Sequence, residues 1–329
     1  MEGTMKEITL KAYAKINLSL EVTGRRSDGY HDIRSLMQGI GLYDVISLTI
    51  CPGNGTKYNL PHCTIDGIVV YLCTDAKTIP VDMSNLAFKG IKAVLDVCAD
   101  RCFGLEDDLI ITIDKRLPVA AGIAGGSGNA AACMLGLNAL LGSPFTMREL
   151  MEIGTGVGAD VPFSIIMNAA RNRERLAGLS GIGEASPAAW ISGIGDIVIP
   201  AQPMQWHVIM ANPGIAVSTK DAYEAIDAIQ AAEGKSADVT AADDPSEWPL
   251  FVNDLEKYTL AGYPEASRLR SIMENELRAD TVLMSGSGPT MVAYYGDRER
   301  ALEDFGTMQA IADREDNWRV WLTTTGDPE

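Results

Sequence analysis

The sequence predicts an α+β protein of two domains, and three observations support this. The chain has 329 residues, which is more than a single hydrophobic core usually serves. Ile8–Leu20 alternates and is rich in strand-forming residues, and Ile46–Ile50 has the pattern of another strand, so the chain begins with a sheet. The C-terminal part contains two strand-like and two helix-like segments, in the order Trp206–Met210, Lys220–Ala232, Glu265–Leu277 and Thr281–Met284.

The middle of the chain predicts a strand, a glycine-rich loop and a helix in succession. The β-branched run Leu109–Ile113 is followed by Pro118, four glycines and the apolar segment Ala130–Leu141. A further helix is expected over Thr146–Ile153, because a threonine at its start and Glu149 three residues later have the spacing of a capping box.

Two segments have no clear period. Between Asn168 and Gly195 most residues are small, polar or glycine, which is typical of an insertion or a linker. Gly234–Glu247 is expected to be a loop.

Composition and charge restrict the function. The formal net charge of −17 argues against a partner such as nucleic acid or an anionic membrane, because both need clustered lysine and arginine. The six cysteines are scattered without metal-ligand spacing, which indicates a reducing compartment. The sequence has no signal-type apolar segment and no stretch of about 18 apolar residues that could span a membrane. We therefore expect a cytoplasmic protein.

The strongest local signal is the glycine-rich segment Pro118–Asn129, which lies directly before an apolar helix. It contains Gly122, Gly125, Gly126 and Gly128. Glycine allows backbone N–H groups to approach an anion, and the start of a helix adds unpaired donors and the positive end of a dipole. In an acidic protein this is the simplest way to hold polyphosphate. A glycine-rich turn that packs closely beneath a helix is the structural alternative.

Two known phosphate loops fit this segment poorly. The Walker pattern needs a lysine after its glycines, and none is present here. Gly126–Ala131 matches the pattern G-x-G-x-x-A, but Asp114–Ala121 separates it from the strand, whereas a dinucleotide-binding loop follows its strand tightly. A second glycine cluster, Met284–Thr290, and Asp160 together suggest two glycine walls and a carboxylate around one cleft.

Short stretches along nearly the whole chain resemble GHMP-superfamily kinases and occur in the family's order. Besides the glycine loop they are Ala14–Leu18, Gly24–His31, Ser84–Leu86, Ile113–Pro118, Gly158–Pro162, Val217–Thr219, Asn253–Glu256 and Ser285–Pro289. Three of them, Ala14–Leu18, Asp28–His31 and Gly158–Pro162, resemble one group within the superfamily. Its members act in non-mevalonate isoprenoid biosynthesis and phosphorylate the C2 hydroxyl of a methylerythritol joined to cytidine diphosphate.

The resemblance implies the GHMP kinase fold. Residues 1–170 would form the ATP-binding domain, which is similar to ribosomal protein S5. Residues 171–329 would form a ferredoxin-like domain that begins with an unusual insertion at about 169–191. The active site would lie in the cleft between the two domains. ATP and Mg²⁺ would be the cofactors, a small cytidyl diphosphate would be the substrate, and the protein would be a monomer or a weak homodimer.

The family's catalytic lysine and aspartate fall on Lys15 and Asp160. By this resemblance Asp160 would accept the proton of the attacking hydroxyl. Lys15 would keep Asp160 ionised and would offset charge on the phosphoryl group in transfer. Without the family pattern, a lone lysine in a strand and an aspartate before Val-Pro would be read as structural residues.

The other site residues also follow from the resemblance. Tyr30 and His31 match the pair that recognises cytosine, by stacking and by hydrogen bonding, and Tyr223 would offer a second face for the base. The substrate's hydroxyls and phosphates would lie near Asn17, Ser285, Gly286, Ser287 and Gly288. Asn85 and Lys115 match positions near the adenine of ATP. The loop residues that would bind ATP are Pro118, Gly122, Gly125, Gly126, Ser127, Gly128 and Asn129.

Two loop positions depart from the family pattern, because Ala124 replaces a glycine and Gly128 replaces a serine. A serine at 128 could offer a hydroxyl to phosphate or metal, so one rival interpretation is a nucleotide-binding homologue with reduced turnover. The retained Lys15 and Asp160 favour an enzyme. Another rival is a GHMP kinase for a different alcohol, such as homoserine, mevalonate or galactose. The Tyr30–His31 pair and the stretch Ala14–Leu18 argue against it.

Overall fold

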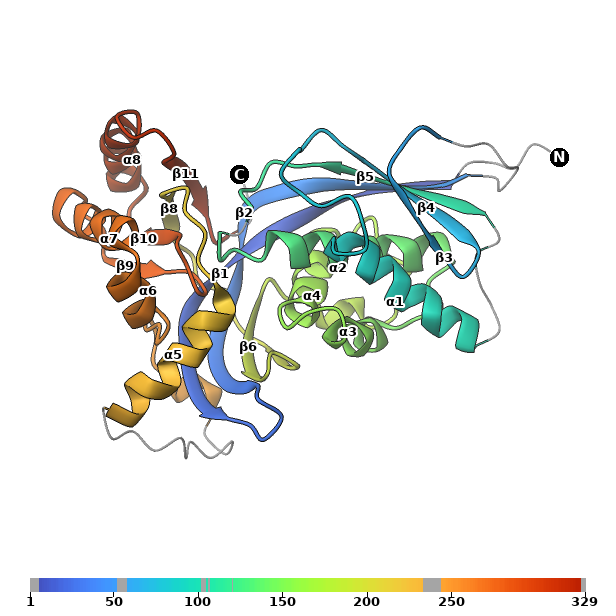
Figure 1. Ribbon diagram of the computed structural model, residues 1–329, viewed down its shortest axis with the longest axis horizontal. Helices are drawn as coiled ribbons and strands as arrows, with labels where there is room; N and C mark the ends of the chain where they lie inside the picture. Colours follow the sequence, from blue (N-terminus) through green and yellow to red (C-terminus); the bar gives the residue numbers. More distant parts are fainter. Residues whose placement is uncertain are drawn as a thin grey trace. The chain divides into compact units, whose positions relative to one another are not determined.

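The computed structural model describes residues 6–51, 58–101, 105, 107–119, 121–232 and 244–326 (Figure 1). Contacts between residues divide the chain into two units. Unit 1 consists of the segments Met1–Ala14, Leu42–Val119 and Ala124–Pro187. Unit 2 consists of the segments Lys15–Gly41, Ala120–Ile123 and Ala188–Glu329. Each unit is built from segments that are separate in the chain, so this division does not test a single domain boundary at residue 170, which stays a prediction.

Two long strands, β1 (Lys6–Arg25) and β2 (His31–Cys51), contribute residues to both units and pair with each other. Strands were predicted in these regions, but shorter ones. All residues from Ala12 to Leu20 are buried, on both faces of the strand, so apolar and polar residues do not alternate along its whole length. The strand signal at the start of the chain is therefore confirmed, whereas its predicted ends are wrong.

In unit 1 the strand order is β3-β4-β5-β2, with β4 and β5 parallel and β5 and β2 antiparallel. The three further strands are β3 (His62–Ile65), β4 (Ile68–Thr74) and β5 (Asp108–Asp114). The helices are α1 (Leu86–Asp100), α2 (Gly125–Leu140), α3 (Met147–Thr155) and α4 (Val161–Arg171). Helix α2 is buried along most of its length and packs against α1 and α4, so it forms the centre of this unit.

The predicted capping box is confirmed at the start of α3. The Thr146 hydroxyl accepts a hydrogen bond from Glu149 N at 3.2 Å, and Glu149 Oε2 accepts one from Thr146 N at 2.8 Å. The bond from the Thr146 backbone and a second one from Arg101 hold the pKa of Glu149 below its usual range.

Helix α2 begins five residues before its predicted start at Ala130. The last glycines of the loop therefore form the first turn of this helix.

Unit 2 contains a four-stranded antiparallel sheet in the order β11-β8-β10-β9. Its strands are β8 (His207–Asn212), β9 (Thr281–Met284), β10 (Met291–Tyr295) and β11 (Arg319–Thr324). Its helices are α5 (Thr219–Ala232), α6 (Glu256–Gly262), α7 (Pro264–Glu276) and α8 (Arg298–Ala312). This βαββαβ sequence and strand order define the expected ferredoxin-like domain, which is confirmed.

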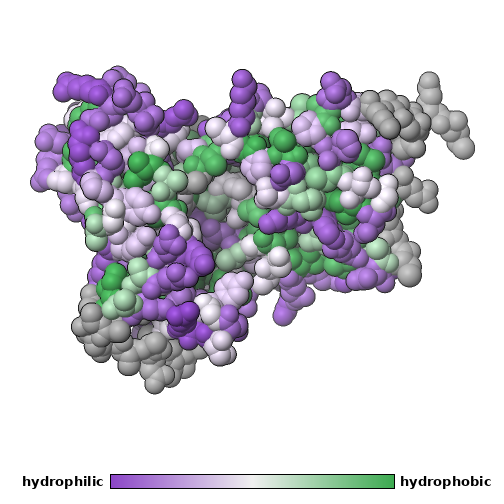
Figure 2. Space-filling view, viewed as in Figure 1, coloured by the Kyte–Doolittle hydropathy of each residue, from purple (hydrophilic) through white to green (hydrophobic). Residues whose placement is uncertain are grey.

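Helices α7 and α8 cover one face of this sheet (Figure 1). Alternate residues of the strands are buried on this face, among them Ile209, Met291 and Ala293. They form one hydrophobic core with Leu269 of α7 and Met308 of α8. The outer surface of the two helices is mostly hydrophilic (Figure 2). This amphipathic arrangement explains why α7 was predictable from its sequence. Unit 2 also contains the hairpin of β6 (Ala188–Gly193) and β7 (Ile197–Pro200), in which β6 pairs with β2.

Between Asn168 and Gly195, where the sequence has no clear period, the structure contains regular elements. Helix α4 continues to Arg171, and β6 begins at Ala188. Between them, short turns and the 3₁₀-helix η1 (Ile182–Glu184) are held by local backbone hydrogen bonds, and Leu176 and Leu179 are buried. Turns of this length are too short to produce a periodic pattern. Whether residues 169–191 are an insertion stays a prediction.

Of the predicted loop Gly234–Glu247, residues 234–243 lie outside the described residues, and Pro245–Glu247 forms the 3₁₀-helix η2. The five cysteines within the described residues carry free thiols, and Cys102 lies outside them. No helix in the described part of the chain is both long and apolar enough to cross a membrane.

Candidate active site

The start of α2 in unit 1 has the features of an anion site. Ala124 precedes the helix in the left-handed conformation, with φ of 55°, and gives no side-chain cap. The first N–H groups of a helix have no partner within the helix, so the first turn from Gly125 exposes donors. The Lys115 ammonium lies 3.6 Å from the position that a Cβ would occupy on Gly125. A cation and open amides therefore meet at the positive end of α2.

The start of α1 lies beside the same turn. Asn85 is the N-cap of α1, and its side chain accepts a hydrogen bond from Ala87 N at 2.9 Å and donates one to Pro80 O at 2.7 Å. A Cβ on Gly126 would lie 3.3 Å from Leu86 Cδ1. The predicted nucleotide-binding residues of unit 1 are thus brought together around two helix N-termini. Asn129, one turn into α2, is buried, and its Oδ1 accepts no hydrogen bond from any described residue.

Gly128 faces β1. A Cβ at this position would lie 2.8 Å from Tyr13 O, and Gly128 O accepts a hydrogen bond from Asn168 Nδ2 at 3.3 Å. Asn168 Oδ1 in turn accepts a hydrogen bond from Tyr13 N at 2.9 Å. The glycine at 128 therefore allows a close approach of α2 to the backbone of β1. For this one position, close packing explains the glycine better than phosphate binding does.

We expect Gly128→Ser to reduce stability. The new Cβ must displace the backbone at Tyr13, and overpacking of this kind costs about 1–3 kcal/mol of unfolding free energy. Because the helix amides remain, the KM for ATP should change by at most about tenfold. Denaturant unfolding and steady-state kinetics test this, with Gly126→Ala as the stability control, since its Cβ meets only the flexible Leu86 side chain. A large rise in kcat in Gly128→Ser would contradict this explanation.

The second glycine cluster packs against the first part of the glycine loop in unit 2. Gly122 has φ of +71°, and a Cβ on it would collide with Ser285 O. The Ser285 hydroxyl donates to Gly122 O at 3.0 Å, and the Ser287 hydroxyl lies 2.8 Å from that of Thr219 at the start of α5. Asn253 Nδ2 donates to the carbonyl oxygens of Met284 and Gly286, at 2.8 Å each, and so holds the second cluster in place.

Lys15 lies on the part of β1 that belongs to unit 2, and the residue is 3% exposed. Its ammonium donates to Asn17 Oδ1 at 2.7 Å, and Asn17 Nδ2 donates to the Ser35 hydroxyl at 2.9 Å. Ser35 donates in turn to Ser19 O at 2.5 Å. This chain of hydrogen bonds fixes the direction of the Lys15 side chain and explains why Asn17 accompanies Lys15 in the motif.

Asp160 is the N-cap residue of α4 in unit 1, but its carboxylate does not cap the helix. Its carbonyl oxygen accepts hydrogen bonds from Ser164 N at 3.0 Å and from the Ser164 hydroxyl at 2.7 Å. Pro162 favours the first turn, where its missing N–H does no harm. The start of α4 thus depends on the backbone of Asp160 and not on its half-buried carboxylate.

In unit 2 the His31 ring stacks on Tyr223, with ring centroids 5.2 Å apart and planes at 29°, whereas the pair implied by the resemblance was His31 with Tyr30. His31 Nε2 lies 2.9 Å from Asp227 Oδ1, and Arg25 Nη1 lies 3.0 Å from Asp227 Oδ2. Tyr30 does not join this stack: it is 62% exposed, and no ring in the described part of the chain packs against it. The exposed Tyr30 ring, which precedes the stacked imidazole in the chain, offers an aromatic face to a planar group.

Comparison with known proteins gives the family. The family model of the GHMP kinases N-terminal domain matches residues 85–168. A 4-diphosphocytidyl-2-C-methyl-D-erythritol kinase of Geobacter metallireducens is 36% identical over 316 residues, which cover 96% of this chain and 98% of the relative. The chain belongs to the 4-diphosphocytidyl-2-C-methyl-D-erythritol kinase family. A member from Caldicellulosiruptor bescii is 35% identical over 89% of this chain and 91% of its own length.

Solved structures of GHMP kinases confirm the fold. The crystal structure of a 4-(cytidine 5'-diphospho)-2C-methyl-D-erythritol kinase matches with a TM-score of 0.66 at 24% identity, over 96% of this chain and 98% of that one. A homoserine kinase from Cytophaga hutchinsonii matches with a TM-score of 0.58 at 14% identity, over 100% and 98%. The predicted two-part GHMP kinase fold is therefore correct.

Two residues beside the motifs of this kinase family were not predicted. Asp227 lies four residues after Tyr223, so helical spacing on α5 could have placed both on one face. Asp44 accepts a hydrogen bond from Lys115 Nζ at 2.8 Å. It lies 71 residues earlier in the chain, and no local signal connects the two.

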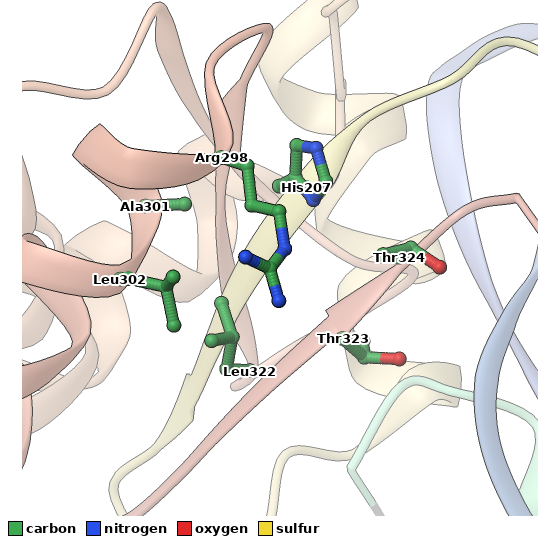
Figure 3. Close-up of a pocket in the computed structure, with 7 residues that line it drawn as sticks. All are labelled: His207, Arg298, Ala301, Leu302, Leu322, Thr323 and Thr324. Atoms are coloured by element: carbon green, nitrogen blue, oxygen red, sulfur yellow. The ribbon is translucent and has the colours of Figure 1, made fainter. Parts of the chain in front are cut away.

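A cavity of about 220 Å³ in unit 2 lies apart from the motifs of the kinase family. It is lined by His207, Arg298, Ala301, Leu302, Leu322, Thr323 and Thr324, with Arg298 extending between His207 and Leu322 (Figure 3). None of the predicted site residues lines it. His207, which matches no motif, is accounted for as a lining residue of this cavity.

Proposed function

We propose that the chain transfers the γ-phosphoryl group of ATP to the C2 hydroxyl of 4-diphosphocytidyl-2-C-methyl-D-erythritol. The stacked His31–Tyr223 pair supports this substrate over other alcohols. A nucleobase needs a flat face and a polar edge, whereas homoserine, mevalonate and galactose have no base to stack. The relatives' names and the high coverage of their sequences agree with this proposal.

ATP is proposed to bind at the start of α2. The amides of Gly125, Gly126 and Ser127 offer donors to phosphate oxygens. The Lys115 ammonium, which the resemblance assigned to the adenine side of ATP, lies beside these amides and adds positive charge there. These features fit a polyphosphate held by backbone groups in a protein of strongly negative net charge.

Mg²⁺ is proposed to enter with ATP. Within the described residues, no three His, Cys, Asp or Glu side chains are grouped as metal ligands. Mg²⁺ is usually held by substrate phosphates, water and one or two protein oxygens, so this observation fits an ion carried by ATP. Ser127 and Asn129 lie in the first turns of α2, and the buried Asn129 Oδ1 accepts no hydrogen bond from a described residue, so their side-chain oxygens are the candidate protein ligands. Bound there, the ion would neutralise phosphate charge.

The proposed chemistry is direct transfer between oxygens. Asp160 accepts the proton of the C2 hydroxyl as this oxygen attacks the γ-phosphorus. Lys15, directed by Asn17, offsets the negative charge on the oxygens of the phosphoryl group in transfer. The loop Ser285–Gly288 offers the amides of Gly286 and Ser287 as donors to the substrate's phosphates. The products are ADP and the C2-phosphorylated alcohol.

The release of ADP with three kinds of alcohol tests this proposal. Folded protein is incubated with ATP and Mg²⁺ and with the cytidyl substrate, with homoserine or mevalonate, or with no acceptor. We expect ADP release that depends on the cytidyl substrate. Release with another alcohol instead would show that the substrate assignment is wrong. Binding of ATP without turnover on any acceptor would favour a homologue that has lost activity.

We expect Asp227→Asn to weaken substrate binding. The carboxylate orients the His31 ring through Nε2, so an amide loses the charge-assisted bond and relaxes the ring orientation. The KM for the cytidyl substrate should rise by about tenfold, while the KM for ATP stays unchanged. Steady-state kinetics with each substrate varied in turn tests this, with Asp221→Asn on the same helix as the control. Equal KM values in Asp227→Asn and wild type would contradict the role of Asp227.

A further inference from the structure

Asp44 of β2 is a carboxylate with 0% exposure in unit 1. Its Oδ2 accepts a hydrogen bond from Lys115 Nζ at 2.8 Å. Its Oδ1 accepts hydrogen bonds from Arg116 N at 2.7 Å and from Leu117 N at 2.8 Å. The side chain therefore holds both the ammonium of Lys115 and the turn that follows β5.

A buried ion pair of this kind is weak evidence for stability. The desolvation of two charges costs about as much as their attraction returns, and an apolar pair of similar volume often stabilises a core equally well. The pair is nevertheless surrounded by hydrogen bonds that fix its geometry, because Leu117 O also accepts from Lys115 Nζ at 2.8 Å. Two of the three N–H groups of the ammonium are thus used, and one is left to point elsewhere.

The position of the ammonium is unfavourable without Asp44. It lies against Gly125, at the positive end of the α2 dipole, where a cation is repelled. The Asp44 carboxylate offsets this repulsion and holds the Lys115 ammonium beside the N-terminus of α2, so that the positive charge of the amine and the positive end of the helix dipole lie together. Such a place attracts an anion. The first turn of α2 therefore depends on Asp44 for the cation beside it.

We propose that Asp44 is a positioning residue for nucleotide binding, which acts by holding the Lys115 ammonium at the start of α2. This inference rests on the proposed function, because it takes ATP as the anion that is bound. The class of ligand is a nucleoside triphosphate, and Asp44 itself does not contact it. Replacement of Asp44 should then affect ATP through Lys115 alone.

Four variants separate this role from a structural one. In Asp44→Asn the amide oxygen can still accept from Arg116 N and Leu117 N, whereas its NH₂ group faces the Lys115 ammonium, donor against donor. Lys115→Met removes the amine. The double variant removes both charges and leaves a neutral pair. Asp114→Asn is the matched control, because Asp114 ends β5 and pairs with Arg116 at the surface, where both side chains are half exposed.

The measurements are the Kd of ATP without acceptor, by calorimetry, and the free energy of unfolding without ATP. We expect Asp44→Asn, Lys115→Met and the double variant each to raise the Kd by about tenfold or more, to similar values. Each single variant should lose stability, and the double variant should recover part of it. Asp114→Asn should match wild type in both measurements. Where turnover is present, the KM for ATP should rise more than kcat falls.

An ATP Kd for Asp44→Asn within about twofold of wild type would overturn the inference. So would a double variant that recovers affinity together with stability, because affinity would then follow folding. If wild type binds ATP but transfers no phosphoryl group, the proposed function fails, while the same variants still decide the role of Asp44. If wild type binds no ATP, both proposals fall.

Discussion

Asp160→Asn is expected to lower kcat by about 10²-fold or more in a protein that stays folded. An amide has nearly the shape of a carboxylate but cannot accept the proton of the attacking hydroxyl. The fold should tolerate the change, because α4 is capped through the Asp160 backbone and not through its carboxylate. The KM for ATP should stay close to that of wild type, since the lost interaction belongs to the transition state.

Steady-state kinetics at saturating ATP, together with thermal unfolding, measures this effect. Asp297→Asn is the matched control: Asp297 is also an N-cap residue, and its side chain accepts from Arg300 N at 2.7 Å, a bond that an amide oxygen can keep. Its kcat should equal that of wild type. Wild-type turnover in Asp160→Asn would show that another group accepts the proton.

Lys15→Met is expected to reduce kcat by a similar factor, about 10²-fold or more. Methionine keeps much of the length of the side chain but has no charge, so charge that develops on the phosphoryl oxygens is no longer offset. The variant also leaves Asn17 Oδ1 without its donor in a buried place, which costs about 1–3 kcal/mol of stability. Unfolding must therefore be measured with activity.

Lys11→Met is the control for this variant. Lys11 lies on the same strand, and its ammonium is 4.5 Å from the centre of the Tyr43 ring. This lysine therefore makes a cation–π contact, away from the proposed catalytic residues. It should keep wild-type kcat. If Lys15→Met is folded and turns over at the wild-type rate, Lys15 has no catalytic role.

Local signals made part of the fold predictable. The capping box at Thr146, the strand Thr281–Met284 and the helix of α7 each depend on neighbours within a few residues, and the structure confirms them. Helix α2 was predicted too short, because glycine is a poor helix former and its low propensity hid the first turn. In the centre of unit 1 the packing of α2 outweighs this propensity.

Contacts between distant parts of the chain could not be predicted. The pairing of Asp44 with Lys115 and the approach of Gly128 to Tyr13 each join residues far apart in sequence. Gly128 seemed to be a lost phosphate ligand in the motif, yet the structure shows that it packs against β1. His31 and Tyr223 were predicted as substrate residues from the family pattern alone, and their stacking adds a physical reason for that assignment.

Analysis of the reaction product by ³¹P NMR and mass spectrometry tests the central claim most directly. Folded protein, ATP, Mg²⁺ and 4-diphosphocytidyl-2-C-methyl-D-erythritol should give one new phosphomonoester on the C2 oxygen, with the diphosphate bridge intact and one ADP formed for each product molecule. A product phosphorylated at another hydroxyl, or no product in a protein that binds ATP, would contradict the account.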